Sequence, residues 1–176
     1  MKLEKSISEI KVGDTAQFSK TLLESDVYLY ARLTGDLNPV HVNEEYAKKT
    51  FFRTRIVHGM LLGGFISTVL ANKLPGPGTI YVSQKLNFLA PVRIGDTLTV
   101  YIEVLDAITE NNRMRLKTIC TIQDGTKVLE GEAVVMPPKL IRNRAARLNQ
   151  VTHICKTHSE DHPKSQNTQK RHMIRI

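Results

Sequence analysis

The sequence predicts an α+β fold in which a curled antiparallel β-sheet wraps around a long central helix. Residues 59–73 are apolar on nearly every side of a helix, a pattern typical of a helix that is buried all round. Every clear segment after this helix alternates apolar and polar residues with period two, which indicates antiparallel strands with one buried face. Because a meander of such strands covers an enclosed helix only by curling round it, the two patterns together favour this architecture.

The first third of the chain is predicted to hold two further helices joined by a loop. Apolar residues recur at helical spacing over 26–33, Ser25 is placed as the N-cap, and Thr34-Gly35 ends the helix. A loop follows through Asn38-Pro39, because proline disfavours helical geometry in the residue before it. A short helix over 44–49 comes next, since acidic residues open it and lysines close it, as the helix dipole prefers.

Turn signals mark the predicted strands. The near-copies VGDT at 12–15 and IGDT at 94–97 each precede a β-favouring stretch, so a strand is expected to start at each of them. Asn111-Asn112 and Asp124-Gly125 stand where hairpin turns are required. The period-two segments, which are the expected strands after the long helix, cover 80–88, 98–104, 114–122 and about 126–136.

The composition is that of a single soluble globular domain with a charged extension. The 176 residues, 41% hydrophobic and 24% charged, allow one hydrophobic core. Pro137-Pro138 closes a predicted domain of residues 1–138 whose net charge is near +1. The remaining segment, 139–176, carries +7 of the chain's +8 and lacks sustained periodicity, so we expect a basic, disordered tail.

The sequence also carries expectations about cellular setting and assembly. Cys120 and Cys155 fit neither a disulfide framework nor a paired metal motif, and the first residues alternate charged and apolar types, unlike a secretory leader. The longest apolar run, 59–71, is shorter than the ~20 residues that cross a bilayer. We therefore expect a cytoplasmic protein with no membrane association. A lone curled sheet leaves an open edge, so pairing of two subunits is also expected.

The hexapeptide DLNPVH carries the clearest chemistry in the sequence. Asp36 and His41 lie five residues apart across a loop stiffened by Pro39, so both side chains can point into one cavity. Adding water to an α,β-unsaturated thioester requires a base for the water, a proton donor for Cα, and stabilisation of the enolate-like oxygen. Asp36 and His41 could meet the first two needs by holding a single water. Backbone N–H groups at the start of the long helix, near His58-Gly59, could meet the third.

Each of these residues also has a purely structural interpretation. The Asp-x-Asn-Pro pattern that includes Asn38 is common in Asx turns. His58 fits a helix-start residue held by local hydrogen bonds, and Ser67, two turns after Gly59, fits a buried hydroxyl bonded to a backbone carbonyl. Gly63-Gly64 fits close packing. The occurrence of all these features in one order within one domain favours the functional interpretation.

In this order the motifs resemble the signature of the MaoC-like family, which comprises (R)-specific enoyl-CoA hydratases and type 2 3-hydroxyacyl thioester dehydratases with the α+β hot-dog fold. The resemblance covers roughly residues 8–138. It is carried by LTGDLNPVHVNE at 33–44, IVHGM at 56–60, LPGPGTIY at 74–81, FLAPV at 88–92 and IGD at 94–96.

The resemblance implies a reaction and a mode of assembly. A trans-2-enoyl thioester and its (R)-3-hydroxyacyl thioester would be interconverted by syn addition of water, in fatty-acid metabolism, without a metal or redox cofactor. Members of the family are homodimers or dimers of similar halves, with the acyl-pantetheine tunnel at the subunit interface. The acyl chain length, the carrier (coenzyme A or acyl carrier protein) and the physiological direction are left open, as is the choice of Asp36 or His41 as formal base.

The resemblance also implies roles for particular residues. Asp36 and His41 correspond to the catalytic pair that orients water, and the Gly59 N–H corresponds to the donor for the thioester carbonyl. Ser67 falls where the family has a hydroxyl near the catalytic carboxylate. The residues expected to support the loop are Asn38, Pro39 and His58.

Three other functions are weighed against this one. A hot-dog acyl-CoA thioesterase would hydrolyse the C–S bond of the same class of substrate, and the Asp36/His41 pair with its Asn-Pro spacing argues against it. A nucleic-acid or acidic-partner binding module is suggested by the basic tail, which lacks interleaved aromatic residues or a recognised binding fold. A metal site in the tail would lack a paired Cys-x-x-Cys or a His-Glu-x-x-His frame. Its ligands would be His153, Cys155, His158 and His162.

Overall fold

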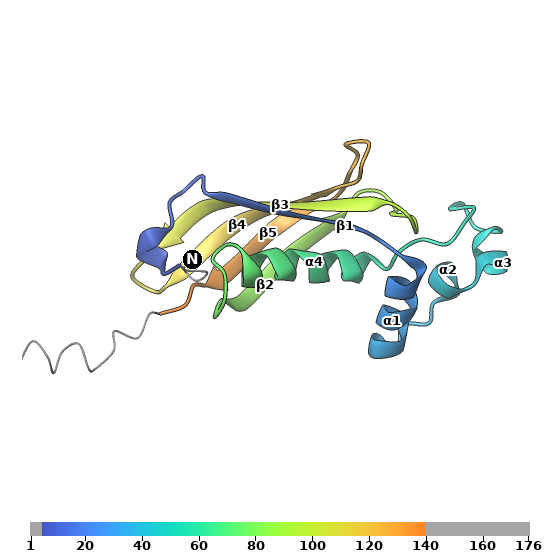
Figure 1. Cartoon of the computed structure of the whole chain (residues 1–176), viewed down its shortest axis with the longest axis horizontal. Helices are drawn as coiled ribbons and strands as arrows, with labels where there is room; N and C mark the ends of the chain where they lie inside the picture. The colour runs from blue at the N-terminus through green and yellow to red at the C-terminus, as the bar shows by residue number, and fades with distance from the viewer. Residues whose placement is uncertain (1–4, 140–176) are drawn as a thin grey trace, which may run out of the picture. The chain divides into compact units, whose positions relative to one another are not determined.

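A computed structural model of the chain describes residues 5–139. Figure 1 shows a long helix, α4, lying beneath an antiparallel sheet, with three shorter helices beyond the amino end of α4. The predicted basic tail falls almost wholly outside the described residues. In chain order the elements are the 3₁₀ helix Ile7–Glu9, β1 Thr15–Thr21, α1 Glu24–Thr34, α2 Pro39–Val42, α3 Glu44–Ala47, α4 Gly59–Asn72, β2 Ile80–Phe88, β3 Thr97–Ile108, β4 Arg113–Thr121 and β5 Lys127–Met136.

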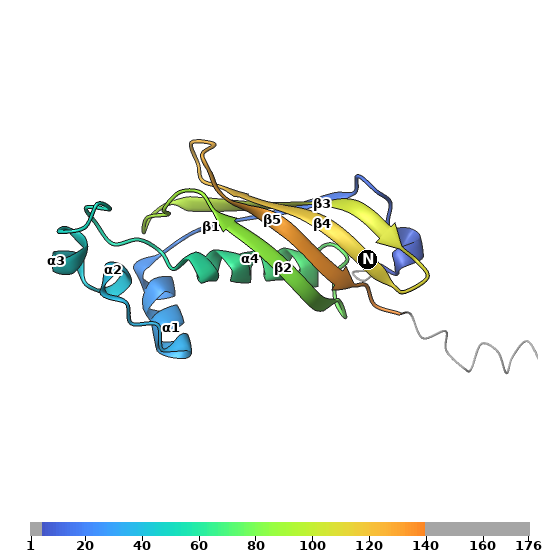
Figure 2. The ribbon, with the colours of Figure 1, turned by 180° about the vertical axis from the view of Figure 1, so that it is seen from behind.

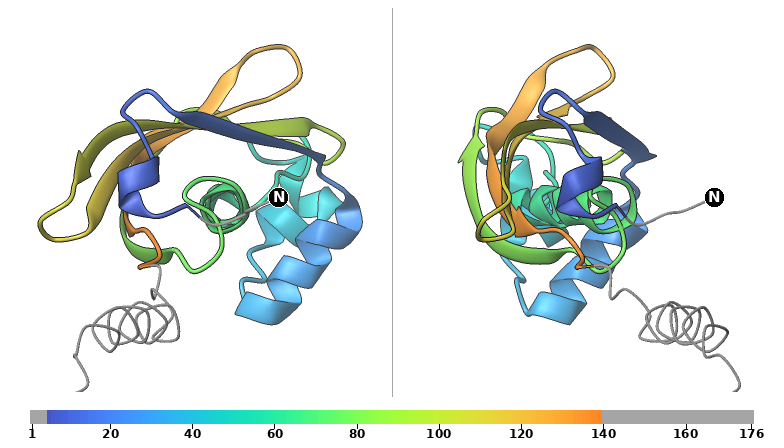
Figure 3. Two further views of the ribbon diagram at one scale, coloured as in Figure 1. Left: turned by 60° about the vertical axis from the view of Figure 1, so that its left-hand side comes forward. Right: turned by 90° about the vertical axis from the view of Figure 1, so that its left-hand side faces the viewer.

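The five strands form one sheet in the order β1-β3-β4-β5-β2, and every neighbouring pair is antiparallel. Viewed close to its axis, α4 sits inside the curve of this sheet (Figure 3). The predicted α+β hot-dog architecture is therefore confirmed. β1 and β3 both begin at the threonine of their turn motifs, and Asn112 (φ 54°) and Gly125 (φ 85°) take the left-handed geometry that tight turns require.

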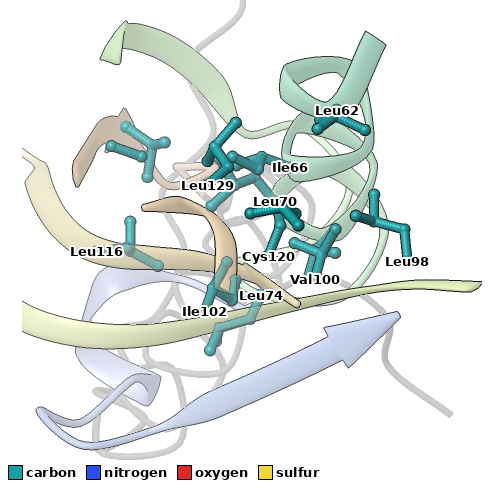
Figure 4. Packing of buried hydrophobic residues seen from close by; sticks show 14 of the residues in the cluster. Leu62, Ile66, Leu70, Leu74, Leu98, Val100, Ile102, Leu116, Cys120 and Leu129 are labelled. Atoms are coloured by element: carbon teal, nitrogen blue, oxygen red, sulfur yellow. The ribbon is translucent and has the colours of Figure 1, made fainter. Parts of the chain in front are cut away.

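The core lies between α4 and the concave face of the sheet (Figure 4). Leu62, Ile66, Val69 and Leu70 of α4 are buried there. They pack against the residues of β3 and β4 that the period-two pattern placed inward, all of which are buried. These are Leu98, Val100, Ile102 and Val104 on β3, and Met114, Leu116, Thr118 and Cys120 on β4.

The prediction that α4 is buried on all sides is wrong for the single chain. Met60 is 58% exposed, and Gly64 is also exposed. The physical reason is that one five-stranded sheet covers only one side of a helix that it curls around. None of the helices within residues 5–139 is long and apolar enough to cross a bilayer.

The simple alternation expected along β2 also fails, because β2 contains a register shift. The pairing with β5 slips between Tyr81 and Ser83. The alternation of inward-facing and outward-facing side chains therefore reverses at this shift. Ile80 and Val82, expected on the buried face, are 59% and 46% exposed. β2 is an edge strand that runs alongside α4 (Figure 2), and its outer side lacks a neighbouring strand within the described part of the chain.

Two boundaries before α4 also differ from prediction. The first helix begins at Glu24 with Leu23 as its N-cap, so Ser25 lies inside the helix. The reason is that the Asp26 carboxylate accepts from the Leu23 N–H (2.9 Å), which caps the helix end earlier. The stretch after Asn38, expected to remain a loop, forms the short helix α2.

Candidate active site

The carboxylate of Asp36 lies in the turn between α1 and α2. Gly35, at φ 79°, ends α1 because a residue without Cβ takes left-handed geometry without strain. The Asp36 N–H donates to Thr34 Oγ1 (3.2 Å), and Asp36 Oδ1 accepts from the Asn38 N–H (3.2 Å). The Asx turn expected as a structural alternative is therefore present. It leaves Asp36 exposed, so turn formation and chemistry are compatible roles for this residue.

The imidazole of His41 is positioned by α2. Asn38 caps this helix by accepting from the Val40 N–H (3.3 Å), and Pro39 is its first residue, where a missing N–H costs nothing. His41 is 8% exposed, and its Nδ1–H donates to the Ile56 carbonyl (2.8 Å). Because a carbonyl can only accept, Nε2 keeps its lone pair in the neutral ring. His41 is thus arranged to accept a proton at Nε2.

His58 is the N-cap residue of α4 and connects the two groups. Its Nε2–H donates to the main-chain carbonyl of Asp36 (3.0 Å), and its ring lies 3.9 Å from the His41 ring and 4.8 Å from the Tyr30 ring, between centroids. His58 is therefore the expected helix-start residue, but its hydrogen bond is not local, since the partner is 22 residues away in sequence.

Asp36, His41 and His58 converge in space. Each offers one oxygen or nitrogen atom, and these atoms lie within 4.8 Å of one another. The carboxylate and the imidazole of DLNPVH therefore lie close together, but of the two only His41 lines the cavity described below, so the expectation that both point into one cavity stays a prediction.

Each histidine of this cluster keeps one ring nitrogen that could transfer a proton or bind a metal ion. His41 Nδ1 and His58 Nε2 are already engaged with carbonyl oxygens. The remaining ring nitrogens are His41 Nε2 and His58 Nδ1, and His58 Nδ1 is buried without a hydrogen-bond partner among the described residues. The other metal hypothesis and the nucleic-acid hypothesis concern tail residues, which lie outside the described residues.

The electrostatic environment keeps His41 neutral. Burial lowers the pKa of His41 below its ordinary value, and the adjacent His58 ring lowers it further. The Ile56 carbonyl and the Asp36 carboxylate oppose this change, but the net direction is downward. An uncharged His41 at neutral pH is the form that can act as a base.

His41 and Gly59 face a common cavity of about 340 Å³. Its walls are mainly apolar and come from the segment after α3, the start of α4, and the end of β2 with its following loop. A Cβ built on Gly59 would lie 2.9 Å from Phe88 Cε1, so any side chain here would push against the Phe88 ring. The other lining residues are Phe51, Phe52, Ile56, Val57, Leu62, Leu89, Ala90, Pro91 and Val92.

Ser67 is not brought to this cavity. It is half-buried on α4, two turns beyond Gly59, and does not line the cavity wall. The hydroxyl role expected for it near Asp36 stays a prediction.

The sequence reasoning missed the aromatic walls of the cavity. Phe51 and Phe52 stack on each other at 3.8 Å between centroids, and Phe51 is 82% exposed. Two adjacent phenylalanines in an otherwise polar stretch were an available signal, because an exposed aromatic pair usually marks a contact surface. Phe88 had been noted only as part of a motif.

Arg55 was also missed, and it braces the helices that carry the site. Its guanidinium bonds Glu24 (2.5 Å) and the Tyr28 hydroxyl (2.9 Å) on α1, and Glu44 (3.4 Å) on α3. This network fixes the segment that precedes Ile56, whose carbonyl orients His41. Since its partners are separated along the chain, nothing local in the sequence signalled it.

The chain is similar to known proteins over its described part. A family model described as "MaoC like domain" matches residues 8–125. An (R)-specific enoyl-CoA hydratase of Rhodospirillum rubrum is 55% identical over 130 residues, covering 74% of this chain and 90% of the relative. A 3-hydroxybutyryl-CoA dehydratase of Methylorubrum extorquens is 49% identical over 131 residues, covering 74% and 83%.

Solved structures agree with this similarity. The unliganded R-hydratase PhaJ1 from Pseudomonas aeruginosa has a TM-score of 0.73 and 45% identity, over 76% of this chain and 86% of that chain. The (R)-hydratase of Aeromonas caviae involved in PHA biosynthesis has a TM-score of 0.71 and 39% identity, over 73% and 98%. With the same fold and a matched family model over most of the described residues, this chain belongs to the MaoC-like dehydratase family.

Proposed function

We propose that this protein is a hydro-lyase that reversibly hydrates trans-2-enoyl thioesters to (R)-3-hydroxyacyl thioesters. One observation carries the proposal. Asp36 and a neutral His41 lie close together, and His41 lines an apolar cavity that Gly59, the first residue of α4, also lines. Support comes from relatives named as (R)-specific enoyl-CoA hydratases at 55% and 38% identity.

In the proposed mechanism, Asp36 and His41 hold one water molecule. As a water O–H bond breaks, the pair takes up the proton and the oxygen bonds to Cβ of the substrate. The electron pair of the C=C bond moves to Cα and the thioester oxygen, and the pair then delivers a proton to Cα. Because water and proton come from one place, both add to the same face of the double bond. The pair acts as a unit, so the protons are assigned to the pair.

The start of α4 is proposed to stabilise the charge that develops on the thioester oxygen. The first N–H groups of an α-helix have no partner within the helix, and its amino end carries partial positive charge. Gly59 is the first residue of α4 and lines the same cavity as His41. Its N–H would donate a hydrogen bond to the thioester oxygen, and this hydrogen bond would become stronger as that oxygen gains negative charge.

The cavity favours an acyl thioester over a charged small molecule. Its walls are mostly phenylalanine, leucine, valine and proline side chains, which suit the acyl chain and the pantetheine arm. The relatives include enzymes named for coenzyme A substrates and for acyl carrier protein substrates. Both carriers present the same pantetheine arm, so the proposal covers both.

We further propose that the protein acts as a homodimer. Apolar side chains are exposed along the open edge strand β2, and others are exposed on α1 and the loops around the site. A second copy packed against β2 and against the side of α4 where Met60 is exposed would cover the first of these surfaces. The exposed large residues concerned include Leu29, Leu33, Leu37, Ile80, Val82, Phe88 and Leu89. A cytoplasmic setting, expected from the cysteines and the N-terminus, stays a prediction.

The decisive experiment is incubation of the purified protein with crotonyl-CoA. Loss of the enoyl absorbance without release of free thiol, together with formation of (R)-3-hydroxybutyryl-CoA on chiral analysis, is the expected result. Release of free thiol would instead support the thioesterase alternative. If neither crotonyl-CoA, a longer enoyl-CoA nor a carrier-bound enoyl group loses its double bond, the proposal is wrong.

A further inference from the structure

One buried histidine lacks a role in the mechanism above. His58 is 2% exposed, and its Nδ1 atom is buried without a hydrogen-bond partner among residues 5–139. Buried polar nitrogens are normally paired, so an unpaired one requires an explanation. Building on the proposed function, we propose that His58 is a positioning residue that holds both Asp36 and His41 through a single neutral ring.

The hydrogen bonding of His58 defines its protonation pattern. Its Nε2 faces the carbonyl oxygen of Asp36 at 3.0 Å, and a carbonyl only accepts, so Nε2 carries the hydrogen. Nδ1 then holds a lone pair. A second proton there would be a buried N–H without an acceptor, carried on a charged ring 3.9 Å from His41. The unpaired nitrogen therefore suits a ring that stays neutral while the site is assembled.

The hydrogen bond from His58 connects the turn that bears Asp36 to a part of the chain distant in sequence. Within the described residues, the other hydrogen bonds of the 35–38 turn reach residues no more than four positions away in sequence. His58 instead belongs to the rigid start of α4, 22 residues further along the chain. Without this bond, the position of Asp36 relative to α4 depends on local turn geometry alone.

The ring of His58 also positions His41 by contact. It stacks on the His41 ring at 3.9 Å and meets the Tyr30 ring of α1 at 4.8 Å, between centroids. Tyr30, His58 and His41 thereby connect α1, α4 and α2. The groups that face His41 are the His58 ring, the Asp36 carboxylate and the Ile56 carbonyl. Loss of the His58 ring would admit water to a face of His41 that the stack now covers.

Two substitutions separate the hydrogen bond from the stack. His58→Phe keeps an aromatic ring but loses the Nε2–H donor, so the Asp36 turn loses its tie. We expect kcat for crotonyl-CoA to fall about 10- to 100-fold with KM changed less than about 3-fold, as for a misplaced catalytic group.

His58→Gln keeps an N–H donor but loses the ring. We expect the acid limb of its kcat/KM profile to move to higher pH, because burial is the main cause of the lowered His41 pKa.

Val69→Ala is the matched control, because Val69 is a fully buried residue of α4 remote from the chemistry. It should lower the melting temperature without changing the pH profile and with little change in kcat. If His58→Phe lost no more kcat than Val69→Ala at a similar loss of melting temperature, or if the acid limb of His58→Gln stayed in place, the positioning role would be rejected.

A measurement on the wild-type protein covers the case in which the variants do not fold. In ¹⁵N-histidine NMR spectra at neutral pH, His58 should be the neutral tautomer with its hydrogen on Nε2. A hydrogen on Nδ1, or a charged ring, overturns the proposal. The tautomer is measured without turnover. A wild-type protein that hydrates none of the three enoyl substrates named above would contradict the proposed function, whereas the tautomer would still test the hydrogen bond of His58.

Discussion

At the scale of single residues, Asp36 and His41 are held by different kinds of support. Asp36 is exposed and is set by a local turn, whereas His41 is nearly buried and is set by a bond from its ring to the Ile56 carbonyl. The carboxylate stays in contact with solvent, while burial favours the neutral form of the imidazole. Two neighbouring groups with different environments are what a joint acid–base role requires.

The first prediction concerns the chemistry of this pair. Asp36→Asn and His41→Ala should each lower kcat for crotonyl-CoA hydration by at least about 100-fold, because positioned acid–base groups typically contribute that much. Circular dichroism and the melting temperature should show that both variants fold. Glu110→Gln, an exposed substitution in the β3–β4 turn, is the control and should keep full activity. A near-wild-type rate in either active-site variant would remove the mechanism.

The second prediction concerns pH. Because burial lowers the pKa of His41, the residue loses its proton at a lower pH than an ordinary histidine, whose pKa is about 6.5. The base form is the deprotonated one, so kcat/KM should stay high as pH falls through 6.5 and decline only below it. The measurement is the pH dependence of kcat/KM for crotonyl-CoA between about pH 4.5 and 9. An acid limb centred above the ordinary histidine value would contradict this assignment.

At the scale of elements, the site depends on how closely β2 approaches its neighbours. β2 ends at Phe88, whose ring packs close to Gly59 of α4, and both residues line the cavity. Beside β2, a Cβ built on Gly131 of β5 would lie 1.8 Å from the backbone carbonyl oxygen of Lys85. A glycine on β5 is therefore required for β2 to lie where it forms the cavity wall.

The third prediction tests this close approach. Gly131→Ala should force β2 to shift and should destabilise the protein by more than about 2 kcal/mol, because a backbone atom cannot move aside as a flexible side chain can. Activity should fall with it, since β2 carries Phe88. Lys127→Ala is the control: Lys127 is exposed at the start of the same strand and makes a surface ion pair with Glu130, so the loss of its side chain should change the stability by less than about 1 kcal/mol. Chemical denaturation measures both, and similar stabilities of the two variants would refute the packing argument.

At the scale of the whole molecule, two of the surfaces that the described domain leaves uncovered support the proposed dimer. One is the outer edge of β2, and the other is the side of α4 that the sheet does not reach, where Met60 is 58% exposed. Exposed sheet edges and exposed apolar side chains both favour association. This is the physical basis of the proposed dimer.

The fourth prediction follows from these surfaces. Light scattering of the wild-type protein should give twice the chain mass, and Val82→Lys on β2 should shift the protein toward monomer, because a charged side chain on an edge strand opposes pairing. If the second copy completes the cavity, kcat/KM should fall at least about 10-fold in the same variant. Val12→Lys, at another exposed valine, which precedes β1 at the other edge of the sheet, should leave the mass unchanged. A monomeric wild-type protein with full activity would exclude the dimer.

Local features of the sequence were enough to determine much of the fold. The period-two pattern of β3 and β4 placed their buried residues correctly, and the repeated Gly-Asp-Thr turns marked the first residues of β1 and β3. Such features are readable because strand alternation and turn geometry depend on residues close together in the chain. The same holds for the Asx turn at Asp36 and the capped helix that carries His41.

Only the tertiary structure decided how these pieces meet. The bond from His58 to the Asp36 carbonyl spans 22 residues, Arg55 reaches partners on two helices, and the cavity joins Phe51 and Phe52 to Phe88 across separate elements. The sequence pattern also assigned α4 burial on all sides, whereas its sheet covers one side. Periodicity reports which face of an element is apolar, but the neighbour that covers this face is chosen by packing between distant segments, and local pattern does not encode that choice.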